Sequence, residues 1–483
     1  MYRQIMVNGE SQRYQHVLWR KEMEEEIKEY QLTTVTFGTA SAPFLAVRTL
    51  IQIAKECEDA EVKRIIEEDF YMDDLLTGAD SIEECLQLQQ KISRQLERYG
   101  FHLRKWCSNS EQVIKSSKAD KEFDIIDIDE NTNVKTLGLQ WKPNEDYFRF
   151  KISEYSSEVT TKRLALSYLA KIFDPHGLLT PVIITAKIFI QSLWLLNISW
   201  DDTLTEELEK TWKQFVTKIS SLQDVHIPRW LNTSSTNKIQ ILGFADASEK
   251  SYAAVVYVKT GKGVALLAAK SKENPIKNKK TLPKLELCAA FLLPRLLRKI
   301  VNVVKADLEV YAWSDSTITL AWIENNRSKD KFIRTRVTGI RNLVPEAQWR
   351  YVKSKENPAD LGSRGESPDK LKGLKLWWSG PEWLSMPEAE WSLAPPEAEL
   401  LNAEKYLIKG HQIAEWPLEL QKLKNELQIN HRHKLSTLQP YVDEEGILRV
   451  GGRLQYSNLQ FDQKHSIIIQ KIQTGGLNYP ERT

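Results

Sequence analysis

The stretch QILGFADAS, residues 240–248, decides the fold of the central part of the chain. It is an apolar run that ends in an acid, Asp246, as expected for a buried strand whose end reaches a site. Residues 252–258 and 264–269 have the composition of two further strands, and a Gly-Lys-Gly turn lies between them. The pattern therefore predicts three consecutive strands, the first of which carries a carboxylate at its end.

Three further acids follow, each beside the end of an expected element. Glu286 lies in the first turn of a helix that begins near Pro283. Asp315 follows an expected strand, and Asp360 comes after another. Each acid alone has a structural explanation, since Glu286 favours a helix N-terminus and Asp315 can cap the next helix. Four acids at successive element ends indicate a metal site, because hard divalent cations prefer oxygen ligands.

This order of strands and helices resembles the ribonuclease H fold. The acids Asp246, Glu286, Asp315 and Asp360 match its catalytic set one for one. The resemblance implies that these four hold two Mg²⁺ (or Mn²⁺) ions, which activate water and stabilise the leaving 3′ oxygen, with an RNA–DNA hybrid as substrate. Related nucleases often carry a histidine before the last acid. This chain has none between His226 and His411, so we do not expect rapid turnover.

A second acidic motif, FYMDDLL, lies at residues 70–76. It predicts two short buried strands with adjacent carboxylates at the tip of the turn, although an acidic polar turn has the same pattern. Together with residues 36–46, 99–109 and 134–141, it resembles the palm motifs of reverse transcriptases from BEL/Pao-type LTR retrotransposons.

The resemblance implies a polymerase remnant. Its residues would be Tyr2, Asp73, Asp74 and Lys105, with Asp73 as a metal ligand. Such a polymerase needs a third carboxylate from an earlier strand, but the first aspartate of the chain is Asp59. We therefore expect Met1 to be an internal methionine of a longer ancestor and polymerase activity to be lost.

Residues 160–230 have helical periodicity, broken at Asp174-Pro175-His176-Gly177. This segment resembles a family region often labelled a Pao-type peptidase. It contains no Asp-Thr-Gly or Asp-Ser-Gly triplet, so we interpret it as a helical connector and keep an aspartic peptidase as an alternative.

The C-terminal third carries weaker signals. The tryptophans of residues 376–384 are interpreted as packing anchors, with base stacking as the alternative. The prolines of residues 387–396 suggest an exposed tether. Residues 438–454 resemble the beginning of a retroelement integrase, but no cysteine follows Cys288, so its zinc module is not expected.

We therefore predict an α/β and α+β multidomain protein with a partial reverse-transcriptase palm, a helical connector and a ribonuclease H-like mixed-sheet domain. The expected parts are a partial palm at 1–110, a palm end or thumb-like segment at 111–158, the connector at 159–236, the ribonuclease H-like domain at 237–370, a linker at 371–435 and an integrase N-terminal stub at 436–483.

Composition agrees with an intracellular protein. The net charge is +2, the four cysteines form no metal or disulfide pattern, and the first residues lack the apolar core of a signal peptide. The apolar stretch at 177–200 is broken by Pro181, Lys187 and Gln191, which favours a buried helix over a membrane span. We expect a cytoplasmic or nuclear location, no membrane, and RNA–DNA hybrid or other nucleic acid as the partner. The oligomeric state is not predicted.

The predicted function is that of a retrotransposon Pol polyprotein fragment with ribonuclease H activity. The alternative is a non-catalytic nucleic-acid-binding or interaction relic of the same element.

Overall fold

The computed structural model describes most of the chain, in two compact units, Met1–Phe148 with Ile227–Arg229 and Arg149–His226 with Trp230–Thr483. The described residues are 1–119, 134–136, 139–155, 160–196, 198–231, 233, 238–304, 308–325, 328–391, 397–425, 427–431, 433–452 and 461–469. Parts of the predicted thumb-like, linker and integrase-like segments, and the tail after residue 472, thus lie outside the described residues.

The first unit is built around three helices, α2 (Ala42–Lys55), α3 (Ala60–Glu68) and α4 (Ile82–Glu97). Asp59 and Ser81 cap α3 and α4, each accepting backbone N–H groups of the first turn. The apolar faces of the helices share one core, formed by Leu50, Ile53, Ala54, Val62, Ile65, Ile66, Leu88, Ile92, Leu96 and Phe101. Helix α2 begins within residues 36–46, the first of the segments that resemble palm motifs.

The smaller elements of this unit are short. They are η1 (Tyr2–Gln4), α1 (Gly9–Gln12), the hairpin β1 (His16–Trp19) and β2 (Lys28–Gln31), the hairpin β3 (Phe70–Tyr71) and β4 (Asp74–Leu75), α5 (Glu111–Ala119), and the strands β5 (Val134–Thr136), β6 (Leu139–Lys142), β7 (Tyr147–Arg149) and β8 (Ile227–Pro228). The hairpin predicted at residues 70–76 is present, with Phe70 opposite Leu75 and Tyr71 opposite Asp74. Its strands are not buried, however, because Tyr71 is exposed and Phe70 and Leu75 are only half-buried.

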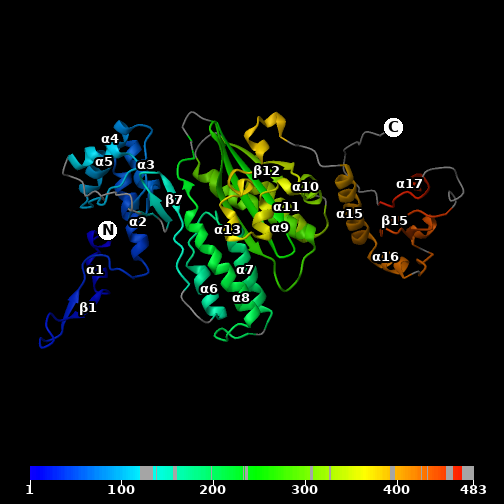
Figure 1. The fold of residues 1–483 in the computed structure, drawn as a ribbon, viewed down its shortest axis with the longest axis horizontal. Coiled ribbons are helices and arrows are strands. Elements are labelled where there is room, and N and C mark those ends of the chain that lie inside the picture. Colours follow the sequence, from blue (N-terminus) through cyan, green and yellow to red (C-terminus); the bar gives the residue numbers. More distant parts are fainter. Residues whose placement is uncertain are drawn as a thin grey trace. The chain divides into compact units, whose positions relative to one another are not determined.

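The second unit contains a five-stranded mixed sheet in the order β11-β10-β9-β12-β13. Figure 1 labels β12 of this sheet. Strands β9 (Ile239–Ala247), β10 (Ser251–Thr260) and β11 (Gly263–Glu273) form an antiparallel meander. Strand β12 (Leu308–Ser314) runs parallel to β9, and β13 (Gln348–Tyr351) runs parallel to β12. The five strands predicted from residues 240–353 are thus confirmed.

Helix α9 (Leu282–Val303) covers one face of this sheet and packs on β9 and β10. It approaches closely because Gly243 has no side chain: a Cβ there would lie 2.7 Å from Cδ1 of Leu293. Helix α11 (Lys331–Leu343) packs on α9, and α10 (Thr317–Glu324) follows β12. The aliphatic core between sheet and helix includes Ile241, Ala245, Val256, Leu293, Leu297 and Val310.

The connector helices belong to the same unit as the sheet. They are α6 (Lys162–Ala170), α7 (Thr180–Trp194) and α8 (Glu206–Ile219), followed by η2 (Ser220–Asp224). The turn before α7 bonds to β11, since the backbone N–H of Ala269 donates to the carbonyl of His176 at 2.8 Å. Helix α7 contacts β11, and Val182, Ile184 and Leu193 within it are buried. The predicted buried helix is therefore confirmed.

The segment after β13 also packs on the sheet. It contains η3 (Ser354–Glu356), α12 (Ala359–Arg364), α13 (Pro368–Leu371), α14 (Lys375–Ser379), η4 (Glu382–Ser385) and η5 (Glu388–Glu390). The Tyr257 hydroxyl donates to the carbonyl of Trp377 at 2.8 Å, and Trp391 contacts Trp313 edge-on at 5.4 Å. Trp377 is buried and Trp383 packs against Phe244 and Trp313, as predicted for packing anchors. Trp391, which lies outside residues 376–384, is buried as well.

These contacts correct the prediction of an exposed tether for residues 387–391, because Trp391 draws that segment onto the aromatic side chains of the sheet. Pro395 and Pro396 lie outside the described residues.

The last described part has its own small core. It comprises α15 (Glu397–Glu415), α16 (Pro417–Lys424), η6 (Lys434–Leu438), the strand pair β14 (Tyr441–Val442) and β15 (Leu448–Arg449), and α17 (Phe461–Lys464). Leu420, Ile429, Leu435, Leu448 and Ile468 form this core. Across the described residues, no helix combines the length and apolar character needed to cross a membrane.

Candidate metal centre

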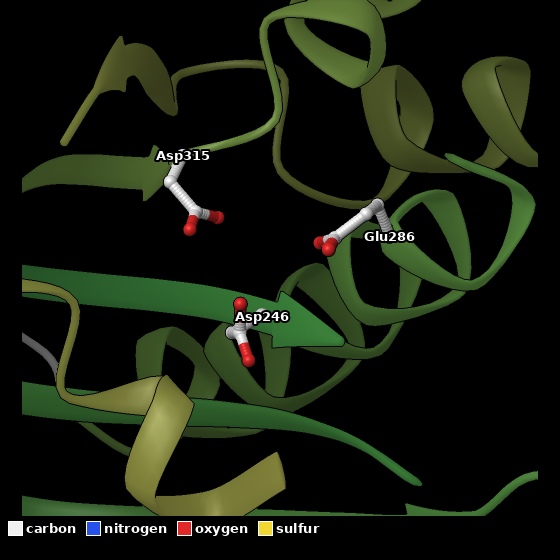
Figure 2. A group of neighbouring side chains, drawn as sticks. All are labelled: Asp246, Glu286 and Asp315. Atoms are coloured by element: carbon white, nitrogen blue, oxygen red, sulfur yellow. The ribbon is translucent and has the colours of Figure 1, made fainter. Parts of the chain in front are cut away.

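Three predicted carboxylates meet at one end of the sheet. Asp246 lies near the end of β9, and Asp315 directly follows β12. These strands are parallel neighbours with Ser314 opposite Ala245, so the next residue of each reaches the same edge. Glu286 enters from the start of α9, and one oxygen from each of the three carboxylates lies within 4.8 Å of the other two (Figure 2).

Burial and mutual repulsion favour the protonated forms of these carboxyls. Burial, then the charge of Asp315, raises the pKa of Asp246 to about 7. Burial, followed by the charges of Asp246 and Asp315, raises the pKa of Glu286 well above its ordinary value. Burial also raises the pKa of Asp315. Without a cation, these carboxyls therefore hold protons more readily than isolated carboxyls do.

Neighbouring donors orient two of these carboxylates. Ser363 donates its hydroxyl to Oδ2 of Asp246, and Ser354 donates to Oδ2 of Asp315 at 2.6 Å. The buried Asn357 donates from Nδ2 to Oδ1 of Asp315 at 3.4 Å and to the carbonyl of Ala245 at 3.1 Å. Hydrogen bonds from Ser363 and Ser354 oppose the rise in the pKa of Asp246 and Asp315, because they favour the ionised form.

Sequence reasoning missed these donors. Their only signal was position, since residues 354–363 surround Asp360. Which of their hydroxyl and amide groups face the other acids depends on how η3 and α12 cross the ends of β9 and β12.

The donor set suits a hard divalent cation. All three groups offer anionic oxygens, the ligands that Mg²⁺ and Mn²⁺ prefer. Oε2 of Glu286 is buried and has no hydrogen-bond partner among the described residues. A buried carboxylate oxygen without a partner is costly unless a proton or a cation compensates it. These residues therefore fit the divalent cation that a ribonuclease H-like fold implies.

Asp360, the fourth predicted acid, lies outside the group of three. It is in the first turn of α12 and forms an ion pair with Arg364, one turn further on. Its charge still contributes to the raised pKa of Asp246, Glu286 and Asp315. Asp360 thus acts on the cluster electrostatically in this conformation.

The residues of the predicted polymerase remnant lie in the first unit. Asp73 is at the tip of the β3–β4 turn and Asp74 is on β4, both exposed. Tyr2 contacts Phe37 edge-on at 5.1 Å, and Lys105 is exposed with a φ of 59°. Within the part of the chain that the structure describes, Asp246, Glu286 and Asp315 are the only three potential ligands whose donor atoms all lie within 4.8 Å of one another. Metal binding by Asp73 remains a prediction.

The fold and this cluster together define a ribonuclease H-like domain. An antiparallel meander continues into two parallel strands, and the acids lie at the end of the first strand, at the start of the helix and after the fourth strand. The fold class predicted from the sequence is therefore confirmed.

Comparison with known families agrees. Residues 161–316 match the family described as the Pao retrotransposon-like RNaseH-like domain. The resemblance to Pao-type retroelements is thereby confirmed for this part of the chain, which includes the connector helices as well as β9 to β12. No curated protein matches the chain.

Solved structures with similar folds include two foamy viral protease–reverse transcriptases. One, in complex with double-stranded DNA, has a TM-score of 0.47 at 14% identity and covers 72% of this chain and 54% of its own. The other, in complex with an RNA/DNA hybrid, has a TM-score of 0.48 at 13% identity, and the match covers 73% of this chain and 43% of the foamy viral chain.

RNase H1 isolated from compost is also similar, with a TM-score of 0.23 at 20% identity over 28% of this chain and 98% of its own. This chain thus spans about half the length of the foamy viral structures.

Proposed function

We propose that the chain hydrolyses the RNA strand of an RNA–DNA hybrid in a reaction that requires Mg²⁺ or Mn²⁺. The observation that carries the proposal is the meeting of Asp246, Glu286 and Asp315 within 4.8 Å at the end of a ribonuclease H-like sheet. The match of residues 161–316 to an RNaseH-like domain supports a hybrid as the substrate. We also propose an intracellular site of action, cytoplasmic or nuclear.

Each acid has a defined part in this proposal. Bound divalent cations would activate water and neutralise charge on the phosphate. Asp246 and Asp315 are fixed on neighbouring strands, and Ser363 and Ser354 keep one oxygen of each in place. Burial and the neighbouring charges raise the pKa of Glu286, so a proton would compete with a cation for this carboxyl, whose Oε2 has no hydrogen-bond partner among the described residues.

Asp360 is proposed as a fourth acid of the site. Asp360 now forms an ion pair with Arg364. To act in the site, its carboxylate would have to leave Arg364 and turn toward the other three acids. The same ion pair favours the alternative function, a non-catalytic nucleic-acid-binding or interaction protein, if this movement does not occur.

A cleavage assay separates these two functions. The full chain is incubated with a labelled RNA–DNA hybrid, with and without Mg²⁺, beside Asp315→Asn and the control Asp224→Asn, which changes an exposed acid of η2. We expect cleavage by the parent and the control in Mg²⁺, and at least a hundredfold loss in Asp315→Asn. Hybrid binding without cleavage by any of the three chains would support the alternative.

A further inference from the structure

Five basic side chains gather on the surface formed by strand β11 and helices α7 and α9. We call them the β11–α9 basic surface, and they are Lys187, Lys270, Lys272, Arg295 and Lys299. Lys270, Arg295 and Lys299 are exposed, and the other two are half-buried.

The cations are close enough to affect one another. The pKa of Lys270 is below its ordinary value, first because of partial burial and then because of the charges of Lys299, Lys272, Arg295 and Lys187. Lys270 and Lys272 point to the same side of β11, since alternate residues of a strand share a face. Lys299 follows Arg295 by four residues, which places both on one side of α9.

None of the five cations forms an ion pair with a described acid. The acid next to them in sequence is Glu273, at the end of β11. Like charges four residues apart on a helix repel each other, so the arrangement is unfavourable for the isolated fold. An anionic ligand would remove that penalty.

Strand register places this surface beside the carboxylate cluster. Asp246 is opposite Ala253 on β10, and Ala253 is opposite Ser271 on β11, between Lys270 and Lys272. Two strand spacings separate the lysine backbones from Asp246, or about 10 Å. Along α9, Arg295 lies nine residues beyond Glu286, or about 13 Å.

We propose that the β11–α9 basic surface binds backbone phosphates of the hybrid on the flank of the cleavage site, with the connector helix α7 contributing Lys187. The inference rests on the proposed function for the identity of the duplex. Backbone contacts of this kind carry no sequence preference, because each neutralises a phosphate and releases counterions. They would hold the duplex while the carboxylates act on one strand.

The test measures how hybrid binding depends on salt. Fluorescence anisotropy in EDTA, which prevents cleavage, gives the affinity of the full chain at several salt concentrations. The variant Lys270→Gln/Lys299→Gln removes two exposed cations from two elements, and the control Lys171→Gln/Lys210→Gln removes two exposed lysines from the connector. The single variant Lys187→Gln tests the contribution of α7.

We expect the slope of log affinity against log salt to become shallower by up to about 2 in the double variant and to remain unchanged in the control. The affinity gap between parent and variant should then widen roughly tenfold as salt falls from about 200 mM to about 50 mM. Thermal unfolding at low salt should show the variant to be at least as stable as the parent, because repulsion is removed.

A double variant with the parent's slope overturns this inference. Cleavage in Mg²⁺ is measured separately. If the parent cleaves the hybrid but the double variant keeps the parent's salt slope, the proposed function is supported and the basic surface is not. A shallower slope in the variant, with no cleavage by the parent, would support the basic surface and contradict the proposed hydrolysis.

Discussion

At the scale of single residues, the cluster of Asp246, Glu286 and Asp315 combines burial with like charge. The sequence identified all three, because each lies beside the end of a predicted strand or helix. It did not identify Ser354, Asn357 and Ser363, since no residue type or spacing reveals which hydroxyl or amide will face a carboxylate from another element. It also could not show that Asp360 pairs with Arg364.

The raised pKa of Asp246 predicts a stability that depends on pH. Folding raises this pKa from 3.8 to about 7, so the folded chain binds more protons than the unfolded chain between these values. The free energy of unfolding of the metal-free protein should therefore fall as pH rises from about 4 to about 7.

Asp246→Asn should remove this loss and stabilise the protein at pH 8 in EDTA by roughly 2–4 kcal/mol, with little effect at pH 4. Urea unfolding of parent and variant at both pH values measures the difference. A variant that is no more stable than the parent at pH 8 would show that repulsion and burial do not act on Asp246 as described.

The hydroxyl of Ser354 offers a second prediction at this scale. It donates to Oδ2 of Asp315, and Ser354→Ala should raise the pKa of that carboxyl and loosen its orientation. We expect a loss of about tenfold in Mg²⁺ affinity, typical of removing a group that orients a ligand.

Calorimetric titration checks this expectation against Ser385→Ala, which removes an exposed hydroxyl that donates to the carbonyl of Glu382. Equal Mg²⁺ affinities in the two variants would exclude an orienting role for Ser354.

At the scale of elements, the sequence predicted which strands and helices form better than it predicted how deeply each is buried. The strands from residue 239 to 273 and helix α9 follow from apolar runs, turns and an N-terminal proline, which are local signals. The half-exposed hairpin at residues 70–75 and the packed segment ending at Trp391 were misjudged, because burial depends on partners distant in sequence.

The contact between the turn at Gly177 and strand β11 can be tested by adding one methyl group at position 177. Gly177 has a φ of +73°, and a Cβ there would lie 1.9 Å from the carbonyl oxygen of Ala269. Gly177→Ala should therefore separate the turn from β11 and destabilise the unit by about 3 kcal/mol, more than the roughly 1 kcal/mol expected from positive φ alone.

Gly446→Ala is the matched control, since Gly446 has a φ of +82° and open space around it. Chemical unfolding of the two variants gives the comparison. If both lose the same stability, the contact between the connector and β11 does not restrict position 177.

At the scale of the whole molecule, the connector helices and the sheet belong to one compact unit. The bond from Ala269 to His176 and the bond from the Trp377 indole to the carbonyl of Leu178, at 2.8 Å, join segments far apart in sequence. The sequence predicted the helices but gave no sign of what they pack on. The family match across residues 161–316 agrees with this docking, because it extends over both parts.

This arrangement predicts shared protection in hydrogen exchange. Amides of α7 and of β11 should open with similar free energies, since neither can separate without breaking the contacts between them. In Gly177→Ala, exchange should accelerate in both elements and remain unchanged in α3 and α4 of the first unit. Faster exchange in α7 alone would show that the connector opens independently of the sheet.

We propose that Asp246, Glu286 and Asp315 form a divalent cation site whose carboxyls release a proton when the ion binds. Calorimetric titration of Mg²⁺ at pH 7, repeated in buffers with different ionisation enthalpies, counts the protons released per ion bound. Because the pKa of Asp246 is about 7 and that of Glu286 is well above its ordinary value, we predict release of about one proton by the parent, and weaker binding with less release by Glu286→Gln. Mg²⁺ binding without proton release, or binding equal in parent and variant, would contradict the claim.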